Sequence, residues 1–243
     1  MSALLSVKGV SKRFRGLVAV DRVSFDVEKG GVFAVIGPNG AGKTTLFNMI
    51  AGMFPPDAGS IAFDGDRIDE LPPDRVCRRG IGRTFQIVRP FPGLSVEDNA
   101  VVGALMHRYS VDDARARAHE VLRRLDLYDK REQRASSLTL PDRKRLEVAR
   151  ALATDPKLLL LDEVMAGLRP TETDRMVAIL QSLNRDTGLT ILLIEHVMRA
   201  VMALASHILV LHHGAAIAEG RPEQVVRDRA VIDSYLGVEA IDA

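Results

Sequence analysis

A glycine-rich stretch that ends in a lysine and two threonines is the part of this sequence whose residue types most directly suggest chemistry. It matches the pattern G-x-x-x-x-G-K-[ST]. The backbone N–H groups of such a loop can crowd around phosphate oxygens, Lys43 can reach the terminal phosphates, and the hydroxyl of Thr44 can bind Mg²⁺. The sequence therefore predicts a nucleotide-binding loop. Its residues are Gly37, Pro38, Asn39, Gly40, Ala41, Gly42, Lys43, Thr44 and Thr45.

The residues on either side of this loop predict the elements that must position it. Residues 32–36 are apolar and β-branched, as in a buried strand, and residues 45–51 place apolar side chains at helical spacing. Gly52 then supplies a helix stop signal. A helix that begins at the loop aims the positive end of its dipole at the same phosphates. A glycine-rich turn that merely happens to contain a lysine would not require this order of strand, loop and helix.

Two carboxylates, Asp162 and Glu163, follow the apolar run at residues 158–161. A buried central strand would deliver both of them at its carboxyl end, where open α/β sheets bind ligands. Asp162 would then orient Mg²⁺ through its water shell, and Glu163 would polarise the attacking water. The alternative is a strand followed by a solvated acidic turn. The phosphate-binding loop upstream favours the catalytic interpretation, because an acidic pair alone would be a weak signal.

A histidine and an aromatic residue are further candidates. His196 follows the apolar run at residues 189–194, so it is predicted at the same edge of the sheet as Glu163. Most lone histidines are ordinary surface or core residues, and this predicted placement is what favours a catalytic one. Phe14 lies just before a predicted turn near Arg15, where it could stack on an adenine or be an ordinary core or edge aromatic.

Short strands and helices alternate along most of the chain, which indicates an α/β fold. Residues 95–153 differ because they are almost wholly helical in pattern, with helix-start signals at Ser95 and Thr139. We expect one domain, residues 1–243, in which this helical subdomain is inserted into a core of residues 1–94 and 154–243. The predicted strands are residues 4–10, 23–27, 32–36, 59–65, 81–85, 158–162, 189–194, 207–211 and 215–219, and the other predicted helices are residues 74–79, 171–183 and 222–236. One apolar helix face is predicted from Ala114, Ala118, Val121, Leu122 and Leu125.

The composition is that of an ordinary globular protein, with 47% hydrophobic and 27% charged residues. A formal net charge of +1 gives no global case for nucleic-acid binding. Cys77 is the single cysteine, so no intrachain disulfide can form and a reducing cytoplasm is the expected compartment. The longest apolar region, residues 190–211, is interrupted by charged and histidine residues, and we therefore predict that it does not span a bilayer.

Taken together, these motifs resemble the ATP-binding subunits of ABC transporters over essentially the whole chain. Gln86 stands where this family has its Q-loop glutamine, and Phe14 stands where it has an adenine-stacking aromatic. The resemblance implies an α/β P-loop NTPase core of the RecA-like type, with an antiparallel β subdomain and an inserted α-helical subdomain. It also implies ATP and Mg²⁺ as ligands. The implied metal-site residues are Thr44, Gln86 and Asp162, and the implied catalytic residues are Glu163, His196 and Gln86.

Finer features are similar to the ATPases of branched-chain amino acid importers. They lie at residues 14–20, 82–95, 145–152, 166–168 and 235–237. The resemblance implies that two ATPase subunits sandwich two ATP molecules, each held by the phosphate loop of one subunit and the signature of the other. It implies integral-membrane permease subunits as partners, an external solute-binding protein that acts indirectly, and a place at the cytoplasmic face of the inner membrane. No nucleic-acid partner is expected.

The signature is where this sequence departs from the family. The usual pattern is Leu-Ser-x-Gly-Gln, and the residues here are Leu138, Thr139, Leu140, Pro141 and Asp142. Pro141 has no N–H, so one donor to the partner's γ-phosphate is missing, and a hydrogen bond to a charged group is worth about 1.5–3 kcal/mol. Asp142 is expected to add negative charge near the phosphate. We therefore expect this chain to pair with a different ATPase subunit, with its own signature completing the weaker site.

Other classes of function remain open at the level of sequence. A P-loop GTPase is disfavoured because no N-K-x-D motif occurs. A soluble ABC-type ATPase that acts on nucleic acid or ribosomes usually has two cassettes or a coiled-coil insertion, and this sequence has neither. A non-hydrolysing, ATP-gated regulatory module would suit Pro141, but Glu163 and His196 argue against it.

Overall fold

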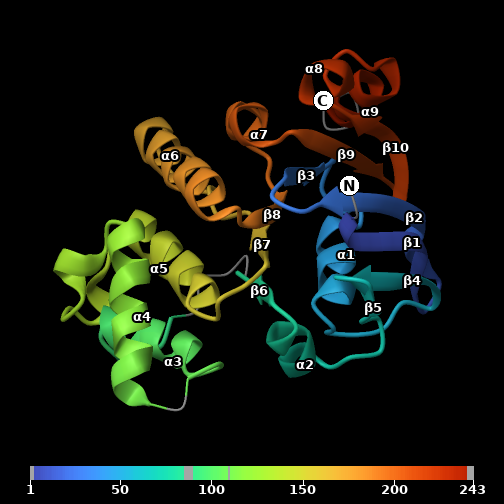
Figure 1. Ribbon diagram of the computed structural model, residues 1–243. Helices are drawn as coiled ribbons and strands as arrows, with labels where there is room; N and C mark the ends of the chain where they lie inside the picture. The colour runs from blue at the N-terminus through green and yellow to red at the C-terminus, as the bar shows by residue number, and fades with distance from the viewer. Residues whose placement is uncertain (1–2, 85–89, 109, 240–243) are drawn as a thin grey trace. The chain divides into compact units, whose positions relative to one another are not determined.

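The structure, a computed structural model, describes residues 3–84, 90–108 and 110–239 of the chain (Figure 1). The chain divides into two compact units. Unit 1 contains residues 1–76 and 190–243, and unit 2 contains residues 77–189. Gln86, the predicted Q-loop glutamine, lies outside the described residues. The predicted helical stretch 95–153 falls inside unit 2, and its standing as a separate subdomain stays a prediction.

An antiparallel sheet forms the first layer of unit 1. Its strands are β1 (Ala3–Phe14), β2 (Leu17–Glu28), β4 (Ala58–Phe63) and β5 (Asp66–Arg67), in the order β2-β1-β4-β5 (Figure 1). Alternate apolar side chains of β2, such as Val23, Phe25 and Val27, are buried while their neighbours are exposed, as expected for a sheet with one covered face. The predicted hairpin turn at Arg15 is confirmed, although both strands are longer than the sequence indicated.

A second sheet in unit 1 carries the phosphate loop. Strand β3 (Val32–Ile36) is parallel to β8 (Thr190–Ile194) and to β9 (His207–His212), and β10 (Ala215–Gly220) pairs antiparallel with β9. Every residue of β3 and β8 is buried, which explains their uninterrupted apolar sequences. The helices of this unit are α1 (Lys43–Ile50), α7 (Met198–Leu204), α8 (Pro222–Val225) and α9 (Arg229–Glu239), and α2 (Pro73–Arg78) spans the boundary in sequence between the units.

The predicted helix at residues 222–236 is two helices, and that prediction was therefore wrong. The break falls between α8 and α9, where the Asp228 carboxylate accepts a hydrogen bond from the N–H of Ala230 at 2.8 Å. An aspartate that binds the backbone two residues ahead favours a turn or a new helix start over continuation of the first helix.

Unit 2 contains two parallel strands and several helices. Strands β6 (Ile81–Arg83) and β7 (Leu158–Asp162) pair in register, and all of β7 is buried. Helices α3 (Val96–Ala104), α4 (Val111–Arg124) and α5 (Leu140–Leu152) pack on one another, and the predicted apolar face of α4 is fully buried (Figure 1). The short 3-10 helices are η1 (Tyr128–Lys130) and η2 (Ala135–Ser137).

Helix α6 (Pro170–Thr187) begins one residue before the position predicted from Thr171. Proline is well suited to a first helical position, because its φ is fixed and its missing N–H would be unpaired there anyway. The Glu172 carboxylate reaches back to accept the N–H of Arg169 at 2.8 Å. These two features together set the start of the helix at Pro170.

Candidate functional site

The phosphate loop in unit 1 is shaped by close backbone approaches. A Cβ atom at Gly37 would lie 2.1 Å from the carbonyl oxygen of Leu211, and one at Gly42 would lie 2.2 Å from that of Ala19. Both glycines also have positive φ, 145° and 99°, which favours glycine at each position. The loop is fixed further by the N–H of Gly214, which donates to the carbonyl of Ala41 at 3.1 Å.

Lys43 folds back over this loop. Its side chain is buried, and its Nζ donates to the carbonyls of Gly37 at 2.7 Å and Pro38 at 2.9 Å. Helix α1 starts after Gly42 without a side-chain cap, so its first-turn N–H groups are open to an anion. Thr44 is exposed in the same turn. A held ammonium, uncapped N–H groups and an exposed hydroxyl fit the phosphate tail of a nucleotide with its Mg²⁺.

Phe14 lies at the exposed end of β1, with 43% of its surface accessible. Its ring meets that of Phe54 edge to face, with the centroids 5.4 Å apart, and Lys12 Nζ lies 5.9 Å from its centroid. Phe14 is thus an edge aromatic held in place by its neighbours and not a core residue. Its role in adenine stacking stays a prediction.

His196 is placed at the carboxyl edge of the second sheet in unit 1, as the sequence predicted. Strands β3 and β8 pair with Val35 opposite Ile194, so the phosphate loop and His196 both leave the sheet at the same end of adjacent strands. Glu195 is only 1% exposed, whereas His196 is exposed to solvent. An exposed imidazole at this edge is accessible to a ligand of the loop.

Asp162 ends β7 in unit 2 and is 1% exposed. Its Oδ2 lies 3.3 Å from Arg83 Nη2, and its N–H donates to Thr84 Oγ1 at 3.1 Å. Burial raises the pKa of Asp162, and the charge and hydrogen bond of Arg83 offset this only in part. Its Oδ1 is buried and has no hydrogen-bond partner among the described residues. A carboxylate oxygen left open in this way fits the water shell of a Mg²⁺ ion.

Glu163 has a backbone conformation that is unusual for a residue with a side chain. Its φ is 52°, in the left-handed region, and its surface is half-buried. Its carbonyl oxygen accepts hydrogen bonds from Lys144 Nζ at 2.9 Å and from the N–H of Ala166 at 3.2 Å. Left-handed residues of this kind concentrate at functional sites, because surrounding contacts must hold them there.

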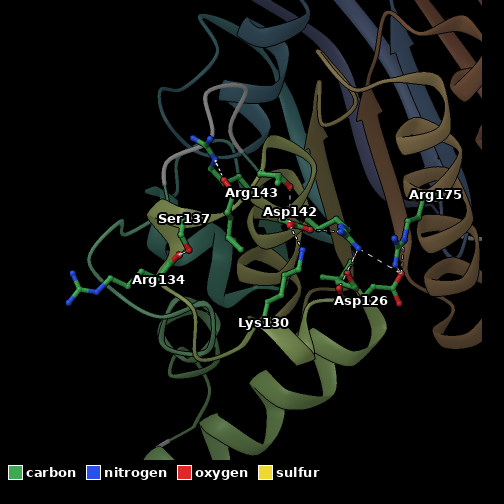
Figure 2. A network of polar contacts seen from close by, with 11 residues as sticks. Asp126, Lys130, Arg134, Ser137, Asp142, Arg143 and Arg175 are labelled. Atoms are coloured by element: carbon green, nitrogen blue, oxygen red, sulfur yellow. Dashed lines mark hydrogen bonds and ion pairs between the residues drawn. The ribbon is translucent and has the colours of Figure 1, made fainter.

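The signature begins α5, and its polar side chains are arranged differently from the sequence-based expectation. Thr139 precedes the helix but does not cap it; its hydroxyl donates to Asp142 Oδ2 at 2.9 Å. Asp142 is 2% exposed and is contacted by Lys130 (Figure 2) and by Arg145. The negative charge that Asp142 was expected to add is therefore compensated by two cations.

The same contacts set the protonation of Asp142. Burial alone would raise the pKa of this carboxyl, but the hydrogen bonds from Lys130 and Thr139 and the charge of Arg145 together hold it below its usual value. Asp142 is therefore ionised at neutral pH. Its charge remains inside an ion-pair network in unit 2.

Several residues in these arrangements were not predicted from the sequence. Their signal is weak because most of their contacts are with residues far along the chain. Arg83 and Thr84 fall in the stretch 82–95 that carries the family resemblance, and Arg145 begins the stretch 145–152, so both stretches could have indicated them. The missed residues are Arg83, Thr84, Lys130, Lys144 and Arg145.

Comparisons with known proteins agree with this geometry. The family model described as ABC transporter matches residues 20–166, and one described as branched-chain amino acid ATP-binding cassette transporter matches residues 217–241. The chain is 39% identical to the high-affinity branched-chain amino acid transport ATP-binding protein BraF of Pseudomonas aeruginosa, over 96% of this chain and 98% of that one. It is 38% identical to the lipopolysaccharide export system ATP-binding protein LptB of Escherichia coli, over 97% and 98%.

A solved structure shows the same fold. The crystal structure of a nucleotide-free ATP-binding cassette from an ABC transporter superposes with a TM-score of 0.88 at 31% identity, covering 96% of this chain and 99% of that one. The predicted fold class, an α/β P-loop NTPase, is confirmed by this likeness. The individual roles of the site residues are not tested by it.

Proposed function

Because the chain belongs to the family of ATP-binding subunits of ABC transporters, we propose that its ATP hydrolysis drives the import of branched-chain or other hydrophobic amino acids. The match of residues 217–241 to a branched-chain amino acid cassette model supports this solute class. Overall identity does not separate importer from exporter, since BraF and LptB are 39% and 38% identical to the chain. The C-terminal match is what favours the importer.

The single observation that carries the hydrolytic part of the proposal is the phosphate loop with Lys43 folded over it. Lys43 would exchange its two carbonyl partners for the terminal phosphates. Thr44 in unit 1 and Asp162 in unit 2 are each assigned to Mg²⁺ by the family resemblance. Bound Mg²⁺ supplies charge neutralisation on the phosphates. Glu163 would polarise the attacking water, and His196 would assist at the γ-phosphate. Gln86 is assigned to metal and water by resemblance alone.

The permease subunits need a docking surface, and the region after residue 89 in unit 2 supplies exposed apolar side chains. Four large hydrophobic residues in and near α3 are 37–45% exposed, and exposed apolar side chains contribute to interaction sites. They are Phe91, Leu94, Val102 and Leu105. No helix built from the described residues has the length and apolarity to cross a membrane. We propose attachment to permeases at the cytoplasmic face of the inner membrane, with solute delivered by an external binding protein.

The second ATPase subunit is proposed to be a different chain. Pro141 offers no N–H, and the Thr139 hydroxyl is already donated to Asp142, so the signature has lost two donors for a partner's nucleotide. A homodimer would place this weakened signature in both of its ATP sites. A heterodimer would confine it to one.

Reconstitution tests the proposal. The chain is co-expressed with the two permeases and the second ATPase subunit of its transporter, placed in liposomes, and assayed for phosphate release with and without leucine and the binding protein. We expect solute-stimulated hydrolysis in the complex and little from the chain alone. Glu163→Gln should lower turnover about 100- to 10,000-fold while ATP stays bound.

The exposed Glu70→Gln serves as the matched control, because it removes a carboxylate of the same type on the surface of unit 1. It should leave hydrolysis unchanged. Undiminished turnover in the Glu163→Gln complex would contradict the proposed catalysis. Full two-site turnover by this chain as a homodimer would contradict the proposed pairing.

A further inference from the structure

An acidic residue lies in the first turn of α5, where the signature meets phosphate in the proposed function. The N-terminus of a helix attracts anions through its N–H groups and its dipole. A carboxylate in that turn competes with an incoming phosphate for the same groups and repels it. Asp142 occupies this position, and Pro141 beside it has already removed one N–H donor. Something in the structure must therefore compensate the charge of Asp142 if the turn is to receive a phosphate.

The compensating groups are Lys130, from η1, and Arg145, one turn further along α5. Figure 2 shows Lys130 beside Asp142. Lys130 Nζ contacts Asp142 Oδ2, and Arg145 Nη2 contacts Asp142 Oδ1. Thr139 Oγ1 donates to the same Oδ2 at 2.9 Å. The Asp142 carboxylate is thereby buried among these three partners, while the first turn of α5 has no side-chain cap.

The network continues to a second carboxylate. Arg145 Nη1 donates to the carbonyls of Leu125 at 3.3 Å and Asp126 at 3.4 Å, and lies 3.8 Å from Asp126 Oδ2. Arg175 of α6 contacts the same carboxylate oxygen at 2.9 Å. Three cations thus face the carboxylates of Asp142 and Asp126, which leaves the network with one net positive charge. Removing Lys130 makes the network neutral and leaves Asp142 with Arg145 as a single counter-charge.

The two cations on Asp142 differ in exposure. The side chain of Arg145 is 9% exposed, whereas that of Lys130 is 40% exposed. Lys130 also lines a cavity of about 230 Å³ together with Thr139 and Pro141, so part of its side chain lies beside the signature at the surface of unit 2. Loss of Arg145 would remove a nearly buried counter-charge from Asp142, the donor to Asp142 Oδ1, and the hydrogen bonds from Arg145 to the carbonyls of Leu125 and Asp126. Lys130 can be removed with much less effect on the fold.

We propose that Lys130 is a positioning residue of the signature: together with Arg145 it neutralises Asp142, so that the first turn of α5 can receive the phosphate tail of the nucleotide bound by the partner ATPase subunit. This inference rests on the proposed function, in which the two subunits share their nucleotides. It assigns Lys130 no contact with the nucleotide. Its effect is electrostatic and depends on the presence of the Asp142 carboxylate.

A double-variant experiment on the assembled transporter tests this dependence. The KM for ATP and kcat are measured for the wild type, Lys130→Met, Asp142→Asn and the Lys130→Met/Asp142→Asn pair. We expect the KM of Lys130→Met to rise about tenfold at low ionic strength, with a smaller rise at high salt. Asp142→Asn in the same chain should return the KM to within about twofold of the wild type, because no carboxylate then needs compensation.

The exposed Lys29→Met is the matched control for loss of a lysine charge, and its kinetics should equal those of the wild type. Persistence of the KM defect in the double variant would overturn the proposal, since Lys130 would then touch the nucleotide or support the fold directly. So would an unchanged KM in Lys130→Met. Failure of the proposed function appears separately, as undiminished hydrolysis in the Glu163→Gln complex.

Discussion

Gly42 and Gly40 lie two positions apart in the phosphate loop, and both have positive φ, 99° and 77°. Their surroundings differ. A Cβ at Gly42 would lie 2.2 Å from the carbonyl oxygen of Ala19, whereas a Cβ at Gly40 would have no atom within 4 Å. Gly42 is therefore required by backbone conformation and by space together, and Gly40 by conformation alone.

These two positions give a matched pair of variants. Gly42→Ala should lower the free energy of unfolding by about 2–5 kcal/mol, because left-handed strain adds to a clash with backbone. Gly40→Ala should cost only about 1–2 kcal/mol, the strain alone. Urea denaturation of the full chain measures both. Equal losses in the two variants would show that the approach of Ala19 does not constrain the loop.

The functional residues that the sequence predicted lie in short, continuous motifs. The phosphate loop and the pair of Asp162 and Glu163 could be found because each motif is continuous along the chain. The contact between Lys130 and Asp142 could not, since the two residues are 12 positions apart and on different helices. The sequence predicted a helix start at Thr139, but its hydroxyl donates to the Asp142 carboxylate and does not cap the helix. A buried carboxylate without donors costs more free energy than an exposed helix end that water can solvate.

Helix starts illustrate how much local sequence determines at the level of elements. Ser95 precedes α3, and its hydroxyl accepts the N–H of Asp98 at 2.9 Å. Ser110 precedes α4 in the same way, but its hydroxyl is 3.5 Å from the N–H of Asp113, beyond the usual range for such a bond. The same residue type in the same position therefore makes caps of different strength.

This difference predicts unequal effects of the same substitution. Ser95→Ala should lower the free energy of unfolding by about 1 kcal/mol, as loss of a well-formed N-cap usually does. Ser110→Ala should cost less than half of that, because little hydrogen bonding is lost. Thermal unfolding monitored by circular dichroism compares the two variants directly. A larger loss at Ser110 would show that the longer distance does not reflect a weaker cap.

Strands were predicted correctly where every residue is buried, because the sequence there is an uninterrupted apolar run. The uninterrupted apolar runs of β3, β7 and β8 correspond to strands in which every residue is buried. The ends of elements were less accurate. The single predicted tail helix splits at Asp228, because a side chain there competes for the backbone, and such competition is decided by geometry that periodicity does not report.

At the scale of the whole molecule, the residues assigned to hydrolysis are contributed by both units. Unit 1 supplies the phosphate loop and His196, and unit 2 supplies Asp162, Glu163 and the signature. The composition, with its net charge of +1, did not indicate a role in ATP hydrolysis. That role was indicated by the resemblance of the motifs to ABC transporter subunits. The family comparisons then confirmed the class of protein, while the transported solute stays a proposal.

The most direct test of the account is equilibrium binding of Mg²⁺-ATP to the full chain carrying Glu163→Gln, with and without Lys43→Ala. Without a functional Glu163, bound ATP persists long enough for its affinity to be measured. The account predicts stable binding to Glu163→Gln and an affinity about 10- to 100-fold weaker once Lys43 is removed, since hydrogen bonds to charged phosphate are lost. Absence of binding to the Glu163→Gln chain, or equal affinity with and without Lys43, would contradict it.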